Sequence, residues 1–295
     1  MASDLVIVKK NEVYAKITCE KHVAMELSQY FTFFVPGYQF VPAFRNRIWD
    51  GKIRLFNLNT SQIYLGLLEY LKLFCDERGY TYELEEIEDE FSVYHADKFF
   101  ASLNLHSKGN SIKVMEHQRS AFIHAMQKKR ALLLSPTSSG KSLIAYTIFR
   151  QLLDYQKLKG LIIVPTTSLV EQLYSDFEDY ASDDTFKPYM YVHRVYQGKE
   201  KETTKPLTIS TWQSLYKKSE QFFNMFNALI IDECHLAAGQ SIINTSKKCV
   251  NAEFRLGFTG TLPVEISDKF NIYSFLGHPI FNQKTNDLIE KGILS

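Results

Sequence analysis

From about residue 111 onward, short apolar runs alternate with amphipathic stretches. The apolar runs are four to eight residues long, a length that suits strands, and the amphipathic stretches have helical spacing. Several runs are apolar throughout, which is expected of strands covered by helices on both faces of a sheet. This alternation predicts an α/β fold with an open parallel sheet. The predicted strands are 131–135, 160–165, 190–196, 207–211, 228–233 and 254–260, and the predicted helices are 116–129, 167–180 and one that opens at Lys141.

Polar motifs follow five of these strands directly. They are SPTSSGKS (135–142), PTTS (165–168), STW (210–212), DECH (232–235) and TGTLP (259–263). In open parallel sheets, ligands bind beyond the carboxyl ends of the strands. Five polar motifs at one edge of one sheet therefore predict a single functional site.

Residues 1–110 have a different pattern. Residues 61–79 carry apolar side chains at helical spacing, and alternation around Asp50-Gly51 predicts a two-stranded hairpin over 44–56. Six of the eight residues in 83–90 are acidic, and 102–113 is polar and turn-rich. We therefore expect a small α+β domain over 1–110 and the parallel sheet over 111–295.

Composition narrows the class of protein. The chain is 45% hydrophobic and 23% charged, as in soluble globular proteins, and it contains no apolar run long enough to span a membrane. The start of the chain lacks the order of a signal peptide. The four cysteines are scattered, which predicts a cytoplasmic protein without a zinc site or disulfide framework. Because the net charge is only +1, any nucleic-acid surface must be a local patch.

The stretch LLLSPTSSGKSLIAY (132–146) has the strand, turn and helix of a phosphate-binding loop. Such a loop points backbone N–H groups at phosphate oxygens at the positive end of a helix dipole. Gly140 permits close approach, Lys141 reaches the β- and γ-phosphates, and the Ser142 hydroxyl is a magnesium ligand. Ser135 stands where the motif has its first glycine, but a small residue can start the turn. The candidate ATP-binding residues are Ser135, Thr137, Ser138, Ser139, Gly140, Lys141 and Ser142; a chance Gly-Lys-Ser in a loop is the alternative.

Two adjacent carboxylates end the apolar strand over 228–231. Asp232 is placed to hold Mg²⁺ and Glu233 to accept a proton from the attacking water. The alternative, two solubilising acids at the end of a strand, is a weak explanation because they follow a Gly-Lys-Ser motif in the same sheet.

The order and spacing of these motifs across 113–263 resemble those of superfamily 2 helicases. The resemblance rests on SPTSSGKS, IIVPTTSLVEQ (162–172), ISTWQSL (209–215), DECH and GFTGTLP, and it includes Gln118 in MEHQRSAF. It implies a RecA-like, doubly wound motor domain that uses ATP and Mg²⁺. Three positions depart from the family pattern: Ser135, Ser138 and Gly260 replace other small residues.

The resemblance also implies roles for single residues. Gln118 would read adenine, while Lys141, Asp232, Glu233 and His235 would carry the ATPase chemistry. Thr259 and Thr261 would couple the nucleotide state to nucleic acid. The implied contacts to one nucleic-acid strand are Pro165, Thr166, Thr211 and Trp212.

Together with its N-terminal domain, the whole chain resembles the first part of recombination helicases of T-even phages; the motor subunits of restriction enzymes are the nearest rival. The resemblance implies branched or partly single-stranded DNA, including forks, Holliday junctions and RNA–DNA loops, as the partner, and the host cytoplasm as the compartment if the gene is of a phage. Relatives place ATP between two motor domains. Because no arginine follows Arg255, we expect a fragment that lacks the second motor domain and has little activity alone.

The N-terminal stretch FRNRIWDGKIRLF (44–56) interleaves cations with aromatic residues. Its cations are Arg45, Arg47, Lys52 and Arg54. This composition suits attraction to phosphates combined with base stacking, although an ordinary hairpin with a solvated basic face is equally compatible.

Two classes of function follow. The first is an ATP-driven DNA helicase or translocase. The second is a binding module that uses nucleotide only as a switch. A restriction-system translocase ranks lower because no nuclease carboxylate pattern precedes the phosphate loop. The sequence predicts nothing of the oligomeric state.

Overall fold

The computed structural model describes residues 3–84, 91–136, 139–196, 204–238 and 240–282. Its contacts divide the chain into two compact units. The first comprises 1–88 and 262–278, and the second comprises 89–261 and 279–295. The expected boundary lay near residue 110, whereas here the first unit ends at residue 88 and also includes residues 262–278. The packing of each unit explains both differences.

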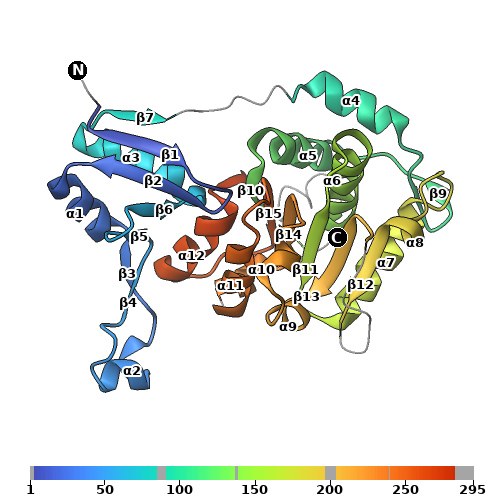
Figure 1. Cartoon of the computed structure of the whole chain (residues 1–295). Helices are drawn as coiled ribbons and strands as arrows, with labels where there is room; N and C mark the ends of the chain where they lie inside the picture. The colour runs from blue at the N-terminus through green and yellow to red at the C-terminus, as the bar shows by residue number, and fades with distance from the viewer. Residues whose placement is uncertain (1–2, 85–90, 137–138, 197–203, 239, 283–295) are drawn as a thin grey trace. The chain divides into compact units, whose positions relative to one another are not determined.

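A seven-stranded sheet forms the centre of the second unit (Figure 1). Every pairing in it is parallel, which confirms the predicted α/β class. In spatial order the strands are β12 (Val192–Val195), β13 (Leu207–Thr211), β11 (Gly160–Val164), β14 (Ala228–Ile231), β15 (Phe254–Thr259), β10 (Arg130–Leu134) and β16 (Pro279–Asn282).

The helices of this unit follow the predicted alternation. Helices α5, α6 and α7 pack against one another in a row, and α9 packs on α11. The predicted strand over 190–196 is shorter than expected, because α8 uses its first two residues. The helices are α4 (Val93–Ser102), α5 (Glu116–Lys128), α6 (Lys141–Gln156), α7 (Thr167–Tyr180), α8 (Pro188–Tyr191), α9 (Trp212–Leu215), α10 (Glu220–Phe223) and α11 (Gln240–Lys248), with a 3₁₀ helix over Cys234–Ala238.

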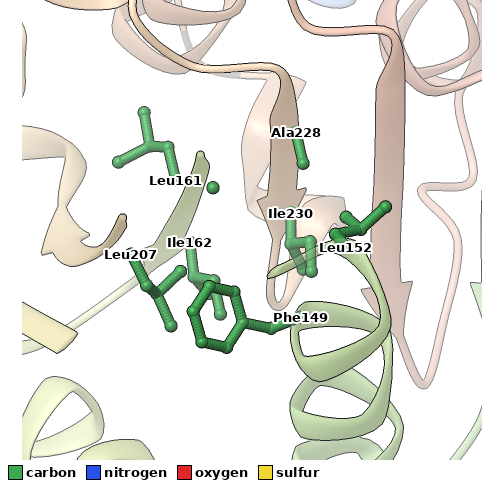
Figure 2. A pocket seen from close by; sticks show the side chains of 8 residues that line it. Phe149, Leu152, Leu161, Ile162, Leu207, Ala228 and Ile230 are labelled. Carbon is green, nitrogen blue, oxygen red and sulfur yellow. The ribbon is translucent and has the colours of Figure 1, made fainter. Parts of the chain in front are cut away.

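Helix α6 is fixed to the sheet by apolar packing. Figure 2 shows Phe149 and Leu152 of α6 beside side chains of β11, β13 and β14. These residues surround a cavity of about 10 Å³, which is at the lower limit for a single water molecule. This packing attaches the middle of α6 to strands β11, β13 and β14.

Residues 89–110 belong to the second unit because of aromatic packing. Phe99 of α4 stacks on Phe122 of α5 with ring centroids 5.4 Å apart. The short hairpin of β8 (His106–Ser107) and β9 (Asn110–Ser111) is anchored to α7, since Asp179 accepts hydrogen bonds from the Ser107 hydroxyl and the Lys108 backbone N–H. The polar stretch 102–113 therefore contains a hairpin that packs on α7.

A five-stranded mixed sheet forms the first unit, as the predicted α+β class requires. Its strands are, in spatial order, β5 (Phe56–Asn57), β6 (Gln62–Tyr64), β2 (Tyr14–Cys19), β1 (Leu5–Lys9) and β7 (Tyr82–Leu84), and its helices include α1 (Lys21–Tyr30) and α3 (Leu68–Arg78). The helix predicted over 61–79 is too long, because β6 and a 3₁₀ helix (Leu65–Leu67) occupy its first part.

The segment 262–278 also belongs to this unit. Its helix α12 (Ile266–Leu276) packs Phe270 on Phe33, with ring centroids 4.6 Å apart. A Cβ atom on Gly66 would lie 2.0 Å from the backbone oxygen of Tyr273, so only glycine permits this close approach. No pattern in the sequence predicts that a segment following the TGTLP motif packs with the N-terminal sheet.

An arm extends from the first unit (Figure 1). Strands β3 (Thr32–Phe34) and β4 (Lys52–Arg54) pair in antiparallel fashion at its base, and a 3₁₀ helix (Tyr38–Phe40) and the short helix α2 (Pro42–Arg45) lie between them. The predicted hairpin over 44–56 is therefore wrong. Pro42 starts a helix instead, as its fixed φ allows, and β4 pairs with a strand 18 residues upstream.

No helix in the described ranges is long and apolar enough to cross a membrane. All four cysteines are free, and three of them are buried.

Candidate functional site

The phosphate loop follows β10 and leads into α6. Gly140 adopts φ +80°, and the Gly140 carbonyl starts the hydrogen-bonding of α6. The Ser135 hydroxyl donates to Ser139 Oγ (2.5 Å), which in turn donates to the Pro136 carbonyl (2.7 Å). Ser135 therefore braces the loop from within, a contact that glycine could not make. Thr137 and Ser138 lie outside the described residues.

Gln118 contacts the same loop from α5. Its Oε1 accepts the Met115 backbone N–H (3.0 Å), and its Nε2 donates to the Ser139 carbonyl (3.1 Å). His117 Nε2 donates to the same carbonyl (2.9 Å). A Cβ on Gly140 would lie 2.2 Å from Gln118 Nε2, so glycine lets the Gln118 side chain keep this position. Sequence reasoning missed His117, which no motif marks.

Lys141 and Glu233 form an ion pair, with Nζ 3.0 Å from Oε1 and the Lys141 side chain 9% exposed. Glu233 adopts φ 47°, in the left-handed region that side chains other than glycine seldom occupy; such a conformation costs about 1–3 kcal/mol and concentrates at functional sites. The phosphate loop and the DECH motif are thus joined directly.

His235 extends this network to the TGTLP motif. Its Nδ1 lies 2.8 Å from Thr259 Oγ1 and 3.3 Å from Glu233 Oε2. The Thr259 hydroxyl donates its only proton to the Thr261 carbonyl (2.8 Å), so His235 Nδ1 must be the donor in the contact with Thr259. An unbroken series of contacts therefore runs from Lys141 to Thr261.

Asp232 and Ser142 supply oxygen donors near the loop. Burial raises the pKa of the Asp232 carboxyl, although nearby Lys141 acts to lower it. One carboxylate oxygen accepts the Glu233 backbone N–H (2.9 Å). Hydroxyl and carboxylate oxygens are the ligands that Mg²⁺ prefers, usually one or two from the protein with substrate phosphates and water. The donor set therefore fits Mg²⁺; within the described ranges no cluster of three or more His, Cys, Asp or Glu side chains forms a metal cage.

The Ser142 hydroxyl has a partner that sequence reasoning did not find. Its Oγ lies 2.8 Å from the hydroxyl of Tyr180, the last residue of α7, and burial raises the pKa of Tyr180.

The four predicted nucleic-acid residues follow β11 and β13, which are neighbours in the sheet. Thr166 caps α7, since its hydroxyl accepts the Leu169 backbone N–H (3.3 Å), and it is exposed. Thr211 is buried and its hydroxyl lies 3.1 Å from Ser214 Oγ, while Pro165 and Trp212 are half-buried. The nucleotide motifs follow β10, β14 and β15, so the two groups of motifs lie side by side at one edge.

The basic residues of the arm line an open groove of about 750 Å³, formed by Phe44, Arg45, Arg47, Ile48, Trp49, Asp50 and Arg54. Arg54 pairs with Asp50 through both guanidinium nitrogens, and this contact holds the pKa of Asp50 below its usual range. Lys52 Nζ lies 4.7 Å from the centre of the Phe34 ring, outside the lining of the groove. Within the groove Arg54 is thus partly neutralised, and Arg45 and Arg47 carry most of the positive charge.

This fold and motif order define the class: a superfamily 2 helicase-type ATPase domain. The family model described as "Type III restriction enzyme, res subunit" matches residues 107–264, more than half of the chain, and the chain belongs to this family. A second model, the N-terminal region of the DNA helicase UvsW, matches residues 4–85. The resemblance to the phage helicase inferred from the sequence is confirmed.

The relatives agree with both models. The chain is 33% identical over 271 residues to the ATP-dependent DNA helicase UvsW of Enterobacteria phage T4, covering 90% of this chain and 52% of the relative. It is 29% identical over 178 residues to the DNA 3′-5′ translocase XPB2 of Sulfurisphaera tokodaii, covering 60% of this chain and 37% of the relative. The chain therefore spans about half the length, or less, of these relatives.

Two solved structures of T4 UvsW resemble the whole chain. The first has a TM-score of 0.86 at 31% identity and covers 94% of this chain and 99% of the solved one. The second has a TM-score of 0.85 at 31% identity and covers 95% of this chain and 57% of the solved one. The likeness thus includes the first unit.

Proposed function

We propose that this chain is the ATP-hydrolysing first part of a DNA helicase or translocase that acts on branched DNA. The observation that carries the proposal is the series of contacts from Lys141 through Glu233 and His235 to Thr259 and Thr261. It joins the phosphate loop to the motif with the implied coupling role, at the edge where Thr166 and Thr211 also lie. Its compartment would be the host cytoplasm if the gene is of a phage.

The arrangement performs hydrolysis in a simple way. Arrival of the nucleotide's β- and γ-phosphates gives Lys141 a stronger partner than Glu233, and the released carboxylate can then accept a proton from the attacking water. Ser142 and Asp232 would hold Mg²⁺, which neutralises charge on the phosphates. His235 remains bonded to Thr259 and is placed to report the change to Thr261.

The arm favours DNA as the partner of the first unit. Its groove combines Arg45 and Arg47 with Phe44 and Trp49, and Ile48, which also lines it, is 80% exposed. Cations attract the phosphate backbone and aromatic faces stack on unpaired bases. Branched DNA offers both at one point, so forks, Holliday junctions and RNA–DNA loops are the substrates we propose.

ATP turnover, measured against the concentration of forked DNA, tests this proposal. Removing two charges with Arg45→Ala and Arg47→Ala should raise the DNA concentration for half-stimulation and lower the salt slope of DNA binding by about two. Turnover without DNA should not change.

The matched control is Lys10→Ala with Lys21→Ala, which removes two charges from exposed positions of the same unit. If the arm variant has the same salt slope as wild type, the arm does not contribute to DNA binding and its role is structural. Absence of any DNA-stimulated turnover in wild type would favour the nucleotide-switched binding module.

A further inference from the structure

The Ser142 hydroxyl is held by a side chain of α7. Tyr180, the last residue of α7, places its hydroxyl 2.8 Å from Ser142 Oγ. The Tyr180 ring packs on Tyr146 of α6 with centroids 5.6 Å apart. The contact between Ser142 and Tyr180 therefore joins the first turn of α6 to the end of α7.

The chemistry of a hydroxyl explains what this contact can do. A serine hydroxyl has one proton to donate and two lone pairs to accept with. A metal ion takes one lone pair, so the proton needs another acceptor. The Tyr180 hydroxyl, 2.8 Å away, can accept that proton, which leaves a Ser142 lone pair for the metal ion.

Helix α7 is well placed to keep this geometry. Asp179 is tied to the β8–β9 hairpin through Ser107 and Lys108, which fixes the end of the helix that carries Tyr180. The other end begins at Thr166, one of the implied nucleic-acid contacts. A single helix thus spans from the proposed nucleic-acid edge to the proposed magnesium ligand.

We propose that Tyr180 is a positioning residue that orients the Ser142 hydroxyl for Mg²⁺. The inference rests on the proposed function, because it assumes that the loop binds a magnesium nucleotide. It assigns α7 a part in nucleotide binding that no motif of the chain indicates.

Titration of a fluorescent ADP analogue, with Mg²⁺ and separately with EDTA, tests the inference. Tyr180→Phe removes the hydroxyl and keeps the ring on Tyr146. We expect its affinity to fall about fivefold with Mg²⁺, the effect of one hydrogen bond, and to equal that of wild type in EDTA. Tyr174→Phe, which removes a hydroxyl from the same helix away from Ser142, should match wild type in both.

A double-mutant cycle separates positioning from packing. Ser142→Ala should show the same loss specific to Mg²⁺, and adding Tyr180→Phe should cause no further loss. An equal loss in EDTA, an additive loss in the double variant, or unchanged or tighter binding with Mg²⁺ would overturn the inference. If Tyr180→Phe lowers the urea midpoint, the readout is the ratio of its affinities with Mg²⁺ and in EDTA. A ratio equal to that of wild type would overturn the inference.

Lys141→Ala distinguishes a failure of the positioning role of Tyr180 from a failure of the proposed function. If Lys141→Ala binds the analogue as tightly as wild type, the loop is not the nucleotide site and the proposed function fails. If it loses binding while Tyr180→Phe behaves as wild type, only the positioning role fails.

Discussion

Replacing Glu233 by glutamine is expected to lower ATP turnover by about 10²- to 10⁴-fold, the usual contribution of a general base. Glutamine has nearly the same shape as glutamate and keeps an oxygen for Lys141, which lies 3.0 Å from Oε1 in the ion pair. It cannot accept a proton from water at neutral pH. Nucleotide affinity should therefore stay close to that of wild type while steady-state phosphate release falls.

Glu253→Gln is the matched control, because Glu253 also pairs with a lysine, Lys129, but precedes β15 rather than following a strand. It should leave turnover unchanged. Turnover equal to wild type in Glu233→Gln would place the general base elsewhere. Tight nucleotide binding without turnover in both wild type and variant would support the nucleotide-switched module.

Replacing Arg255 by alanine is expected to lower the free energy of unfolding by about 3–5 kcal/mol. The side chain is fully buried at the start of β15. Its guanidinium donates to the carbonyls of Ala252 (3.0 Å) and Ser246 (3.1 Å) and to that of Cys249. Alanine would remove all three side-chain donors and would create a cavity, and both effects are destabilising. The Ser246 and Cys249 carbonyls would keep the backbone N–H donors of Cys249 and Ala252.

Urea denaturation measures this effect. Arg119→Ala is the comparison, since its partly exposed ion pairs with Asp97 and Glu116 should contribute only about 0–1 kcal/mol. A midpoint for Arg255→Ala within the error of wild type would contradict a structural role for this arginine. The result bears on function too, because β15 ends at Thr259, the partner of His235.

The sequence predicted the second unit well because its signals are local. Continuous apolar runs marked the buried strands, and the predicted helix over 167–180 has the bounds of α7. Parallel strands place their carboxyl ends at one edge, so the motifs after β10, β11, β13, β14 and β15 had to meet. The contacts among Lys141, Glu233, His235 and Thr259 follow from that topology.

The first unit was predicted less well because its determinants are not local. Asp50-Gly51 is a strong turn signal, yet β4 pairs with β3 across an arm that contains α2. The packing of α12 on Gly66 and Phe33 depends on residues about 200 positions away in the chain. The role of Tyr180 could not be predicted for the same reason. Its spacing in α7 suits a core aromatic residue, and only the packing of α7 on α6 brings it to Ser142.

The most direct test of the whole account is a titration of ADP and a non-hydrolysable ATP analogue against wild type and Lys141→Ala, with urea midpoints measured in parallel. The expected result is saturable binding by wild type and loss of most of that binding in Lys141→Ala. Equal binding by the two proteins would contradict it, because the loop that follows β10 would then not be the site that holds phosphate.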